Sequence, residues 1–336
     1  MSTVVDDRPG FGVGRLARLV RTAVDRLRID LSGAAVLTEA ATGAYVVTPV
    51  IAALAGAQVT AVTRTTRHGS AEEVLRRTAE LAGRFQVEDR IRVVTERTPQ
   101  MFRAADIITN SGHLRPIIGE FAEAIRPGAA LSLMFEAWEI QAGRVDLDLD
   151  GIRSRGVRVA GTNERHPDID VFSYLGSMAV AELADAGVPS YGNRIGVLCD
   201  NPFREFLTSG LTGGGAEVSA AASLHELPIG DLDALVVAVT PTGASVLTAD
   251  DFHLIRMLQP DLVVLQYWGD ISREAAAGVS VWPPSAPADG HMAVLPSKAG
   301  PDAIVNLQAG GLKVGELLLR DPASLSAAER EYLDEL

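Results

Sequence analysis

The chain has 336 residues, 47% of them hydrophobic and 22% charged, which is enough apolar sequence for one large folded domain or for two. Its 30 lysines and arginines are outnumbered by 43 aspartates and glutamates, so the formal net charge is −13. This acidic balance argues against a nucleic-acid partner, because phosphate backbones bind to basic surfaces. The single cysteine, Cys199, cannot form an internal disulfide and fits a reducing, cytoplasmic location.

Residues 15–29 predict a basic amphipathic helix, with apolar side chains on one face and arginines on the others. Such a helix can touch a membrane surface. We expect it instead to pack on its own acidic domain or on a second copy of the chain in a homodimer. No targeting signal is visible at the start of the chain, because the first apolar run is short and interrupted by arginines.

Residues 40–63 carry no charge and are numerous enough to be considered as a membrane span. The run contains Gly43, Pro49 and Gly56, and it ends in a segment rich in β-branched residues. This pattern predicts a buried helix followed by a buried parallel strand, and no membrane partner.

Apolar strands and helices alternate along the rest of the chain, which is typical of a doubly wound α/β fold. Expected helices cover 70–85, 115–128, 170–187, 248–259 and 301–321, and a capped tail at 326–336 follows them. The expected strands cover 34–40, 58–64, 91–97, 106–112, 130–137 and 157–163 in the first half, and 194–200, 217–223, 234–240, 261–270 and 279–283 in the second.

The alternation predicts an α/β protein with two doubly wound, parallel-sheet domains and a ligand cleft between them. We expect an N-terminal amphipathic helix at 1–32, a Rossmann-type dinucleotide-binding domain at 33–188 and a second Rossmann-like domain at 189–336.

The turn after the first strand has the position of a dinucleotide-binding loop. Gly43 stands where the third glycine of G-x-G-x-x-G belongs, while Thr38 and Ala40 replace the first two. Alanine still lets a phosphate approach, and the following helix start offers free N–H groups. Glu39 would repel a pyrophosphate unless it points away. We assign Thr38, Glu39, Ala40, Thr42 and Gly43 to cofactor binding.

The end of the second strand bears on the type of cofactor. An NAD site, like the S-adenosylmethionine site that the same turn resembles, normally has an acidic residue there. This chain has Arg64 and Arg67 instead, followed by Ser70. These side chains suit the 2′-phosphate of NADP, or they are ordinary solvated loop residues. We predict NADP or NAD as the cofactor.

Polar side chains follow three consecutive strands of the first half. Because the carboxyl ends of parallel strands meet at one edge of a sheet, these side chains are expected to form one pocket. The strand-end residues are Asn110, Ser111, His113 and Arg115 after the fourth strand, Glu136, Trp138 and Glu139 after the fifth, and Asn163, Glu164, Arg165, His166 and Asp168 after the sixth; Asp270 and His291 lie in the second half.

A hydride-transfer reaction on a carboxylated substrate would use these groups in three ways. A histidine serves as the acid or base, a carboxylate orients it, and an arginine holds the substrate carboxylate. His166, with Glu164 or Asp168 and with Arg165 or Arg115, could supply these parts. His113 and Asp270 are further catalytic candidates, and His113 alone could equally be a satisfied loop histidine.

The remaining assignments concern binding. Asn110 and Ser111 join the cofactor site, along with Arg64 and Arg67. The predicted substrate contacts are Arg115, Glu136, Trp138, Asn163 and His291. No spacing of histidines, cysteines and carboxylates indicates a metal site.

The segment from "AADIITNSG" through "PIIGEFAEAIRPGAALSLM" resembles the NAD(P)-binding Rossmann enzymes of the D-2-hydroxyacid dehydrogenase type, and "LQAGGLKVGELL" is similar to a domain-packing helix in them. The resemblance implies a family glutamate at Glu164 and a catalytic histidine at His166 or His291. A family arginine would belong at 136–139, where this chain has Glu136-Ala137-Trp138-Glu139.

These observations predict an NAD(P)-dependent oxidoreductase that acts on a small carboxylated metabolite. Two alternatives remain open: a lyase or cyclase that keeps the cofactor for internal redox chemistry, and a non-catalytic Rossmann scaffold that has lost the dinucleotide.

Overall fold

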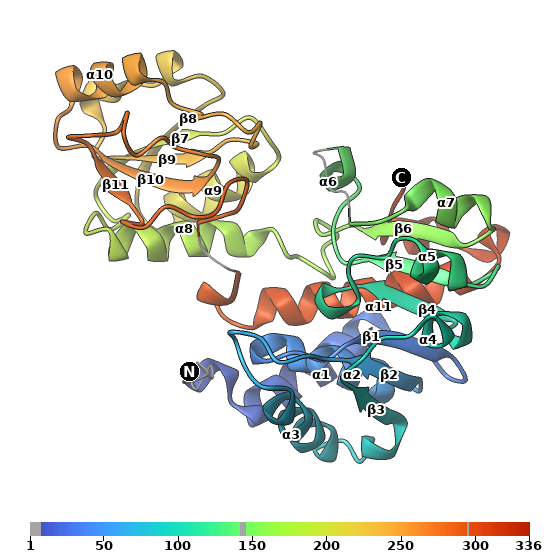
Figure 1. Ribbon diagram of the computed structural model, residues 1–336. Coiled ribbons are helices and arrows are strands. Elements are labelled where there is room, and N and C mark those ends of the chain that lie inside the picture. Colours follow the sequence, from blue (N-terminus) through green and yellow to red (C-terminus); the bar gives the residue numbers. More distant parts are fainter. Residues whose placement is uncertain (1–7, 142–145, 294–295) are drawn as a thin grey trace. The chain divides into compact units, whose positions relative to one another are not determined.

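The computed structural model describes residues 8–141, 146–293 and 296–336, and the chain divides into two compact units (Figure 1). The first unit comprises Met1–Val171 and Gly300–Leu336, and the second comprises Phe172–Ala299. The predicted α/β class is confirmed, because each unit contains a mainly parallel sheet with helices between its strands. The compact units differ from the expected ranges: residues 172–188 go with the second unit, and 300–336 return to the first.

Within the described residues, the first unit forms one sheet of order β12-β6-β5-β4-β1-β2-β3. Strands β1 to β6 are parallel, and β12 is antiparallel to β6. Apart from β12, this is the 3-2-1-4-5-6 order of dinucleotide-binding folds, with its reversal between β1 and β4. The strands are β1 (Ala35–Glu39), β2 (Gln58–Val62), β3 (Ile91–Val94), β4 (Ile107–Asn110), β5 (Ala130–Leu133), β6 (Arg158–Thr162) and β12 (Leu333–Asp334).

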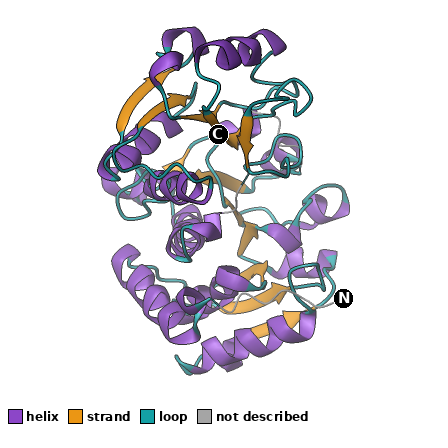
Figure 2. Ribbon diagram, turned by 90° about the vertical axis from the view of Figure 1, so that its left-hand side faces the viewer, coloured by secondary structure: helices purple, strands orange, loops and turns teal. Residues whose placement is uncertain are grey.

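Helices cover both faces of this sheet (Figure 2). One face carries α1 (Val13–Leu27), α2 (Val47–Leu54), α3 (Ala71–Gly83) and α11 (Asp302–Leu319). The other carries the short helices α4 (Pro99–Ala104), α5 (Glu120–Ala124) and α7 (Leu149–Ser154), which pack on a buried apolar cluster. Helix α6 (Trp138–Gln141) follows β5, and α12 (Ala327–Arg330) precedes β12.

The uncharged run and the basic helix behave as predicted. Residues 40–63 contain the buried helix α2 and the parallel strand β2. Helix α1 packs on α2 and α11 of its own unit, and Arg15 forms an ion pair with Asp302 at 2.8 Å. No helix in the described part of the chain is long and apolar enough to cross a membrane.

Helix α11 explains why the end of the chain belongs to the first unit. It lies directly against β4, β5 and β6, because glycines on its inner face allow a close approach (Figure 1). A Cβ atom at Gly311 would come within 2.1 Å of Met134 Sδ, and one at Gly315 within 2.6 Å of Ile107 Cγ2. The hydroxyl of Ser132 on β5 also donates a hydrogen bond to the Gly311 carbonyl.

The second unit has a smaller parallel sheet of order β11-β10-β9-β7-β8. This is a 2-1-3-4-5 doubly wound order, with its reversal between β7 and β9. Helices α8 (Ser173–Asp185) and α9 (Phe203–Gly213) pack on one face, and α10 (Ala249–Leu258) on the other. The strands are β7 (Arg194–Leu198), β8 (Glu217–Ala221), β9 (Ala234–Ala238), β10 (Val263–Trp268) and β11 (Ser280–Trp282).

Two elements differ from the sequence prediction. The helix expected at 115–128 shortens to α5, because Pro116 cannot donate an N–H and Gly119 has a φ of 55° just before the helix. The tail begins as predicted, with a capping box between Ser326 and Glu329, but it ends in strand β12 rather than continuing as a helix.

Candidate functional site

The candidate site lies at the carboxyl ends of the first unit's strands, around the reversal between β1 and β4. The chain leaves β1 toward α2 on one face of the sheet and leaves β4 toward α5 on the other, which opens a crevice between them. The predicted site residues of the first half belong to this edge or to the loops that follow it.

The turn after β1 presents an uncapped helix start. Thr42 is the N-cap residue of the 3-10 helix η2 (Gly43–Val46), but its side chain makes no capping hydrogen bond. Gly43 has a φ of 64°, which favours glycine, and a Cβ there would meet no atom within 4 Å. The first N–H groups of this segment are therefore the kind of site that an anion can occupy.

Thr38 and Ser111, which the sequence assigns to cofactor binding, have a different role. Thr38 lies within regular β1, so this β-branched residue needs no positive φ. Its hydroxyl lies 2.7 Å from that of Thr109, which lies 2.8 Å from that of Ser111. This buried chain of hydroxyls ties β1 to β4 beneath the crevice.

Glu39 points across the crevice rather than over the turn. Its side chain is only 5% exposed, and Oε2 accepts a hydrogen bond from the His113 N–H at 3.0 Å, with the Gly112 N–H as a second donor. Burial raises the pKa of Glu39, while these N–H groups and Arg115 oppose the rise. The carboxyl group therefore does not occupy the uncapped helix start.

Asn110 lies beside Glu39 with its hydrogen bonds unmade. It is 1% exposed, and neither Nδ2 nor Oδ1 has a partner. Leu37 and Ile108 share one core cluster, so Glu39 and Asn110, two positions further along neighbouring strands, project from the same face. A buried amide with both atoms unpaired is costly, which indicates a place for a ligand or an ordered water.

His113 is a second group of this kind. Its Nδ1 is buried without a partner, and burial together with the nearby Arg64 lowers the pKa of the ring. A neutral imidazole therefore faces the crevice near neutral pH.

Four carboxyl groups gather at this edge: Glu39, Glu136, Glu139 and Glu164, which we call the acidic edge. Glu164 is 8% exposed, and burial, followed by Glu139, Glu136 and Asp334, raises its pKa well above the usual range. Burial is also the main cause that raises the pKa of Glu139 to about 7.

Tyr45 on η2 connects the two ends of the acidic edge. Burial raises the pKa of Tyr45 to about 12, and both Glu39 and Glu164 add to the rise. The phenol therefore stays protonated and lies near carboxyl groups from β1 and β6. The predicted convergence of the strand ends is present in the geometry, and Tyr45 is a member that the sequence did not single out.

Two arginines at the edge are engaged by carboxylates. Arg165 Nε lies 3.1 Å from Glu136 Oε1, and Trp138 Nε1 donates to Glu136 Oε2 at 2.9 Å. Arg115 pairs with Asp146 at 3.2 Å. These pairs occupy the arginines that the sequence assigned to a substrate carboxylate.

The loop at 163–168 is held by the end of the chain. The His166 ring, 9% exposed, stacks on Tyr332 with ring centroids 3.9 Å apart, and its Nδ1 accepts the Asp168 N–H. The Tyr332 hydroxyl donates to Asp168 Oδ2 at 2.6 Å. Asn163 accepts and donates hydrogen bonds on the backbone of 331–332. The structure thus gives Asn163, His166 and Asp168 packing contacts, which the sequence could not pair with Tyr332.

Arg64 and Arg67 lie in an exposed loop after β2, as the NADP hypothesis requires. The Thr42 hydroxyl donates to the His68 carbonyl at 3.2 Å, so this loop adjoins the turn after β1. Ser70 is the N-cap of α3 and accepts the Glu73 N–H, which is a structural role.

The two remaining candidates belong to the second unit. Asp270 accepts the Gly290 N–H at 2.8 Å, and exposed His291 places Nδ1 2.9 Å from the Asp289 carbonyl. At that unit's strand reversal, Asp200 after β7 accepts hydrogen bonds from the N–H and hydroxyl of Thr240 after β9. A carboxylate thus already occupies amide donors at that reversal.

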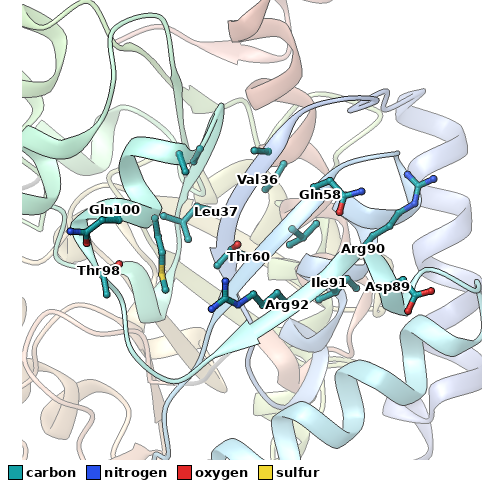
Figure 3. Close-up of a pocket in the computed structure, with 15 residues that line it drawn as sticks. Val36, Leu37, Gln58, Thr60, Asp89, Arg90, Ile91, Arg92, Thr98 and Gln100 are labelled. Carbon is teal, nitrogen blue, oxygen red and sulfur yellow. The ribbon is translucent and has the colours of Figure 1, made fainter.

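A cavity of about 540 Å³ lies elsewhere on the first unit (Figure 3). It opens over β1, β2 and β3 beside the short helix α4, and its lining includes Leu37, Thr60, Arg92 and Met101. None of the predicted site residues lines it. Among the described residues, no group of three or more histidines, cysteines or carboxylates is placed to hold a metal ion.

Strand order, reversal point and helix placement define the first unit as a Rossmann-type domain. No family model matches the chain, and no curated protein matches it by sequence. The fold is similar to that of a dipicolinate synthase from Bacillus halodurans, with 11% identity, 87% of this chain and 100% of that chain covered, and a TM-score of 0.55.

Two further structures are similar. A dipicolinate synthase from Bacillus subtilis has 10% identity and a TM-score of 0.52 over 84% of this chain and 95% of that one. A D-lactate dehydrogenase from Treponema pallidum has 12% identity and a TM-score of 0.46 over 71% of this chain and 91% of that one. The resemblance to Rossmann-type proteins is confirmed as a likeness of fold.

Proposed function

We propose that this protein is an oxidoreductase that uses NAD(P) and acts on a small metabolite at the carboxyl edge of the first sheet. The observation that carries the proposal is the uncapped, open turn at Gly43, at the strand reversal where Rossmann-type sheets bind dinucleotides. The unpartnered amide of Asn110 in the same crevice supports it.

The residues present fit such a cofactor. The N–H groups of 40–44 would hold the pyrophosphate, and Arg64 and Arg67 in the adjoining loop would hold a 2′-phosphate. Glu39 does not oppose this, because its carboxyl group is turned onto the Gly112 and His113 amides. When bound, the nicotinamide would supply the hydride acceptor or donor.

The proton chemistry falls to other groups than the sequence suggested. Glu164 and Glu139 lie together at the edge, and a carboxyl group with a raised pKa can donate or accept a proton near neutral pH. His113 is the remaining imidazole at the crevice, and its Nδ1 has no partner in the structure. We therefore assign acid–base work to Glu164 and Glu139, with His113 beside them.

A titration with NADPH and with NADH, followed by tryptophan fluorescence, tests this proposal. We expect both to bind, NADPH more tightly, and Arg64→Ala to weaken NADPH binding about tenfold while leaving NADH binding nearly unchanged. Arg92→Ala is the matched control, because this exposed arginine lines the separate cavity on β3. Absence of binding by either nucleotide would contradict the proposal and favour a non-catalytic scaffold.

Turnover separates the two enzymatic alternatives. Net oxidation of NADPH with added carbonyl compounds supports the oxidoreductase. Product formation with no net change in NADPH would instead indicate a lyase or cyclase with internal redox chemistry. A substrate cleft between the units and a homodimer both stay predictions, and light scattering would test the dimer.

A further inference from the structure

We propose that the ligand held at the acidic edge carries a protonated amine, bound by Glu164, Glu139 and Glu39 together with the side-chain amide of Asn110. This inference rests on the proposed function for the location of the substrate. It replaces the carboxylated substrate that the sequence suggested.

The balance of charge at the edge carries the first part of the argument. The edge gathers four carboxyl groups, and each of its two arginines already pairs with a carboxylate: Arg165 with Glu136, and Arg115 with Asp146. An anionic substrate would meet the remaining carboxyl groups at short range and in a poorly solvated place, where like charges repel strongly. A cationic group is the complement that such a site lacks.

Asn110 points independently to a ligand. Its amide is buried and unpartnered, and it projects from the same sheet face as Glu39. The Oδ1 atom can accept a hydrogen bond from an ammonium group, while Nδ2 can donate to an oxygen of the same ligand or to a water. Glu164 is likewise buried, and no hydrogen bond to its side chain is present among the described contacts.

Protonation of the edge follows from its surroundings. Glu164 faces Glu136, Glu139, Asp334, Tyr45 and Arg165, and its pKa is raised. Glu139 faces Arg115, Glu136, Asp146 and Glu164, and Glu39 faces Arg115, Tyr45 and the amides of 112–113. Near neutral pH a carboxyl group must therefore lose a proton to pair with an ammonium ion, so binding releases protons and tightens as the pH rises.

Three probes of equal size test the inference: n-butylammonium, butyrate and 1-butanol. Tryptophan fluorescence follows their binding, because the Trp138 indole bonds to Glu136 at the edge. We expect n-butylammonium to bind at least tenfold more tightly than either of the others, and tenfold more tightly at pH 8 than at pH 6. Equal or tighter binding of butyrate would overturn the inference, as would binding of the amine that weakens with rising pH.

Variants locate the effect. Glu164→Gln and, separately, Glu139→Gln keep the side-chain shape, and each is expected to weaken n-butylammonium binding at least fivefold. Glu72→Gln on the exposed face of α3 is the matched control, with an expected change of less than twofold. Unchanged binding in both edge variants, with folding verified by circular dichroism, would overturn the inference.

The NADPH titration on the same samples keeps the two proposals distinguishable. NADPH binding without any preference for the amine overturns this inference alone. Amine preference without NADPH binding leaves the cation site standing and removes the oxidoreductase.

Discussion

At the scale of single residues, His166 shows how one side chain can look catalytic in the sequence and be structural in the fold. It lies among ionisable residues after a strand, which favours an acid–base role. In the structure its ring stacks on Tyr332, and its Nδ1 accepts a backbone N–H. These contacts hold the loop that carries Glu164.

We therefore expect His166→Gln to lower the free energy of unfolding by about 1–3 kcal/mol, through loss of a buried stacked ring. Chemical denaturation measures this, with exposed His225→Gln as the control. Turnover should fall severalfold at most. Abolished turnover with unchanged stability would restore the catalytic role that the sequence suggested.

Glu139 makes the stability of the first unit depend on pH. Its pKa is about 7 in the folded chain, against an ordinary value of 4.5. The folded state therefore binds the extra proton between these values, and the stability gained from it is present at low pH and lost as the pH rises from about 4.5 to about 7.

We expect Glu139→Gln to flatten the fall of the melting temperature between pH 5 and 7.5, relative to the unmodified chain. The effect should be small, because the side chain is half-buried. Glu72→Gln should leave the slope unchanged. A slope as steep in Glu139→Gln as in the unmodified chain would show that Glu139 does not titrate in this range.

At the scale of elements, α11 depends on its glycines to reach the sheet. A methyl group at Gly315 would lie 2.6 Å from Ile107 Cγ2 on β4, closer than van der Waals contact allows. We expect Gly315→Ala to cost about 1–3 kcal/mol of stability, despite the better helix propensity of alanine.

Gly14→Ala on α1 serves as its control, because a Cβ at that position meets nothing within 4 Å. This substitution should leave stability unchanged or raise it slightly. Thermal unfolding of both variants measures the difference, and equal melting temperatures would contradict the close packing of α11.

The sequence predicts most elements because buried parallel strands are continuous apolar runs. The eleven expected strands are present, from β1 to β11. Strand β12 was missed, since two residues that pair with β6 from the far end of the chain carry no local periodicity. The contact of Tyr332 with His166 was missed for the same reason.

At the scale of the whole molecule, the assignment of segments to units could not be obtained from local patterns. An apolar helix such as α11 satisfies its periodicity on any sheet, and only the three-dimensional fit of its glycines selects β4, β5 and β6. The convergence of strand ends followed from the α/β rule alone. Which carboxylate pairs with which arginine required the structure.

The central claim is that the first unit, and not the second, holds the dinucleotide. The two strand reversals differ: the first has an uncapped turn with an open Gly43, while at the second Asp200 already accepts the Thr240 N–H. Hydrogen exchange followed by mass spectrometry, with and without NADPH, distinguishes them. We predict slower exchange at 40–46 and 64–70, with 199–205 and 239–243 unchanged. Protection confined to the second pair of segments would contradict the account.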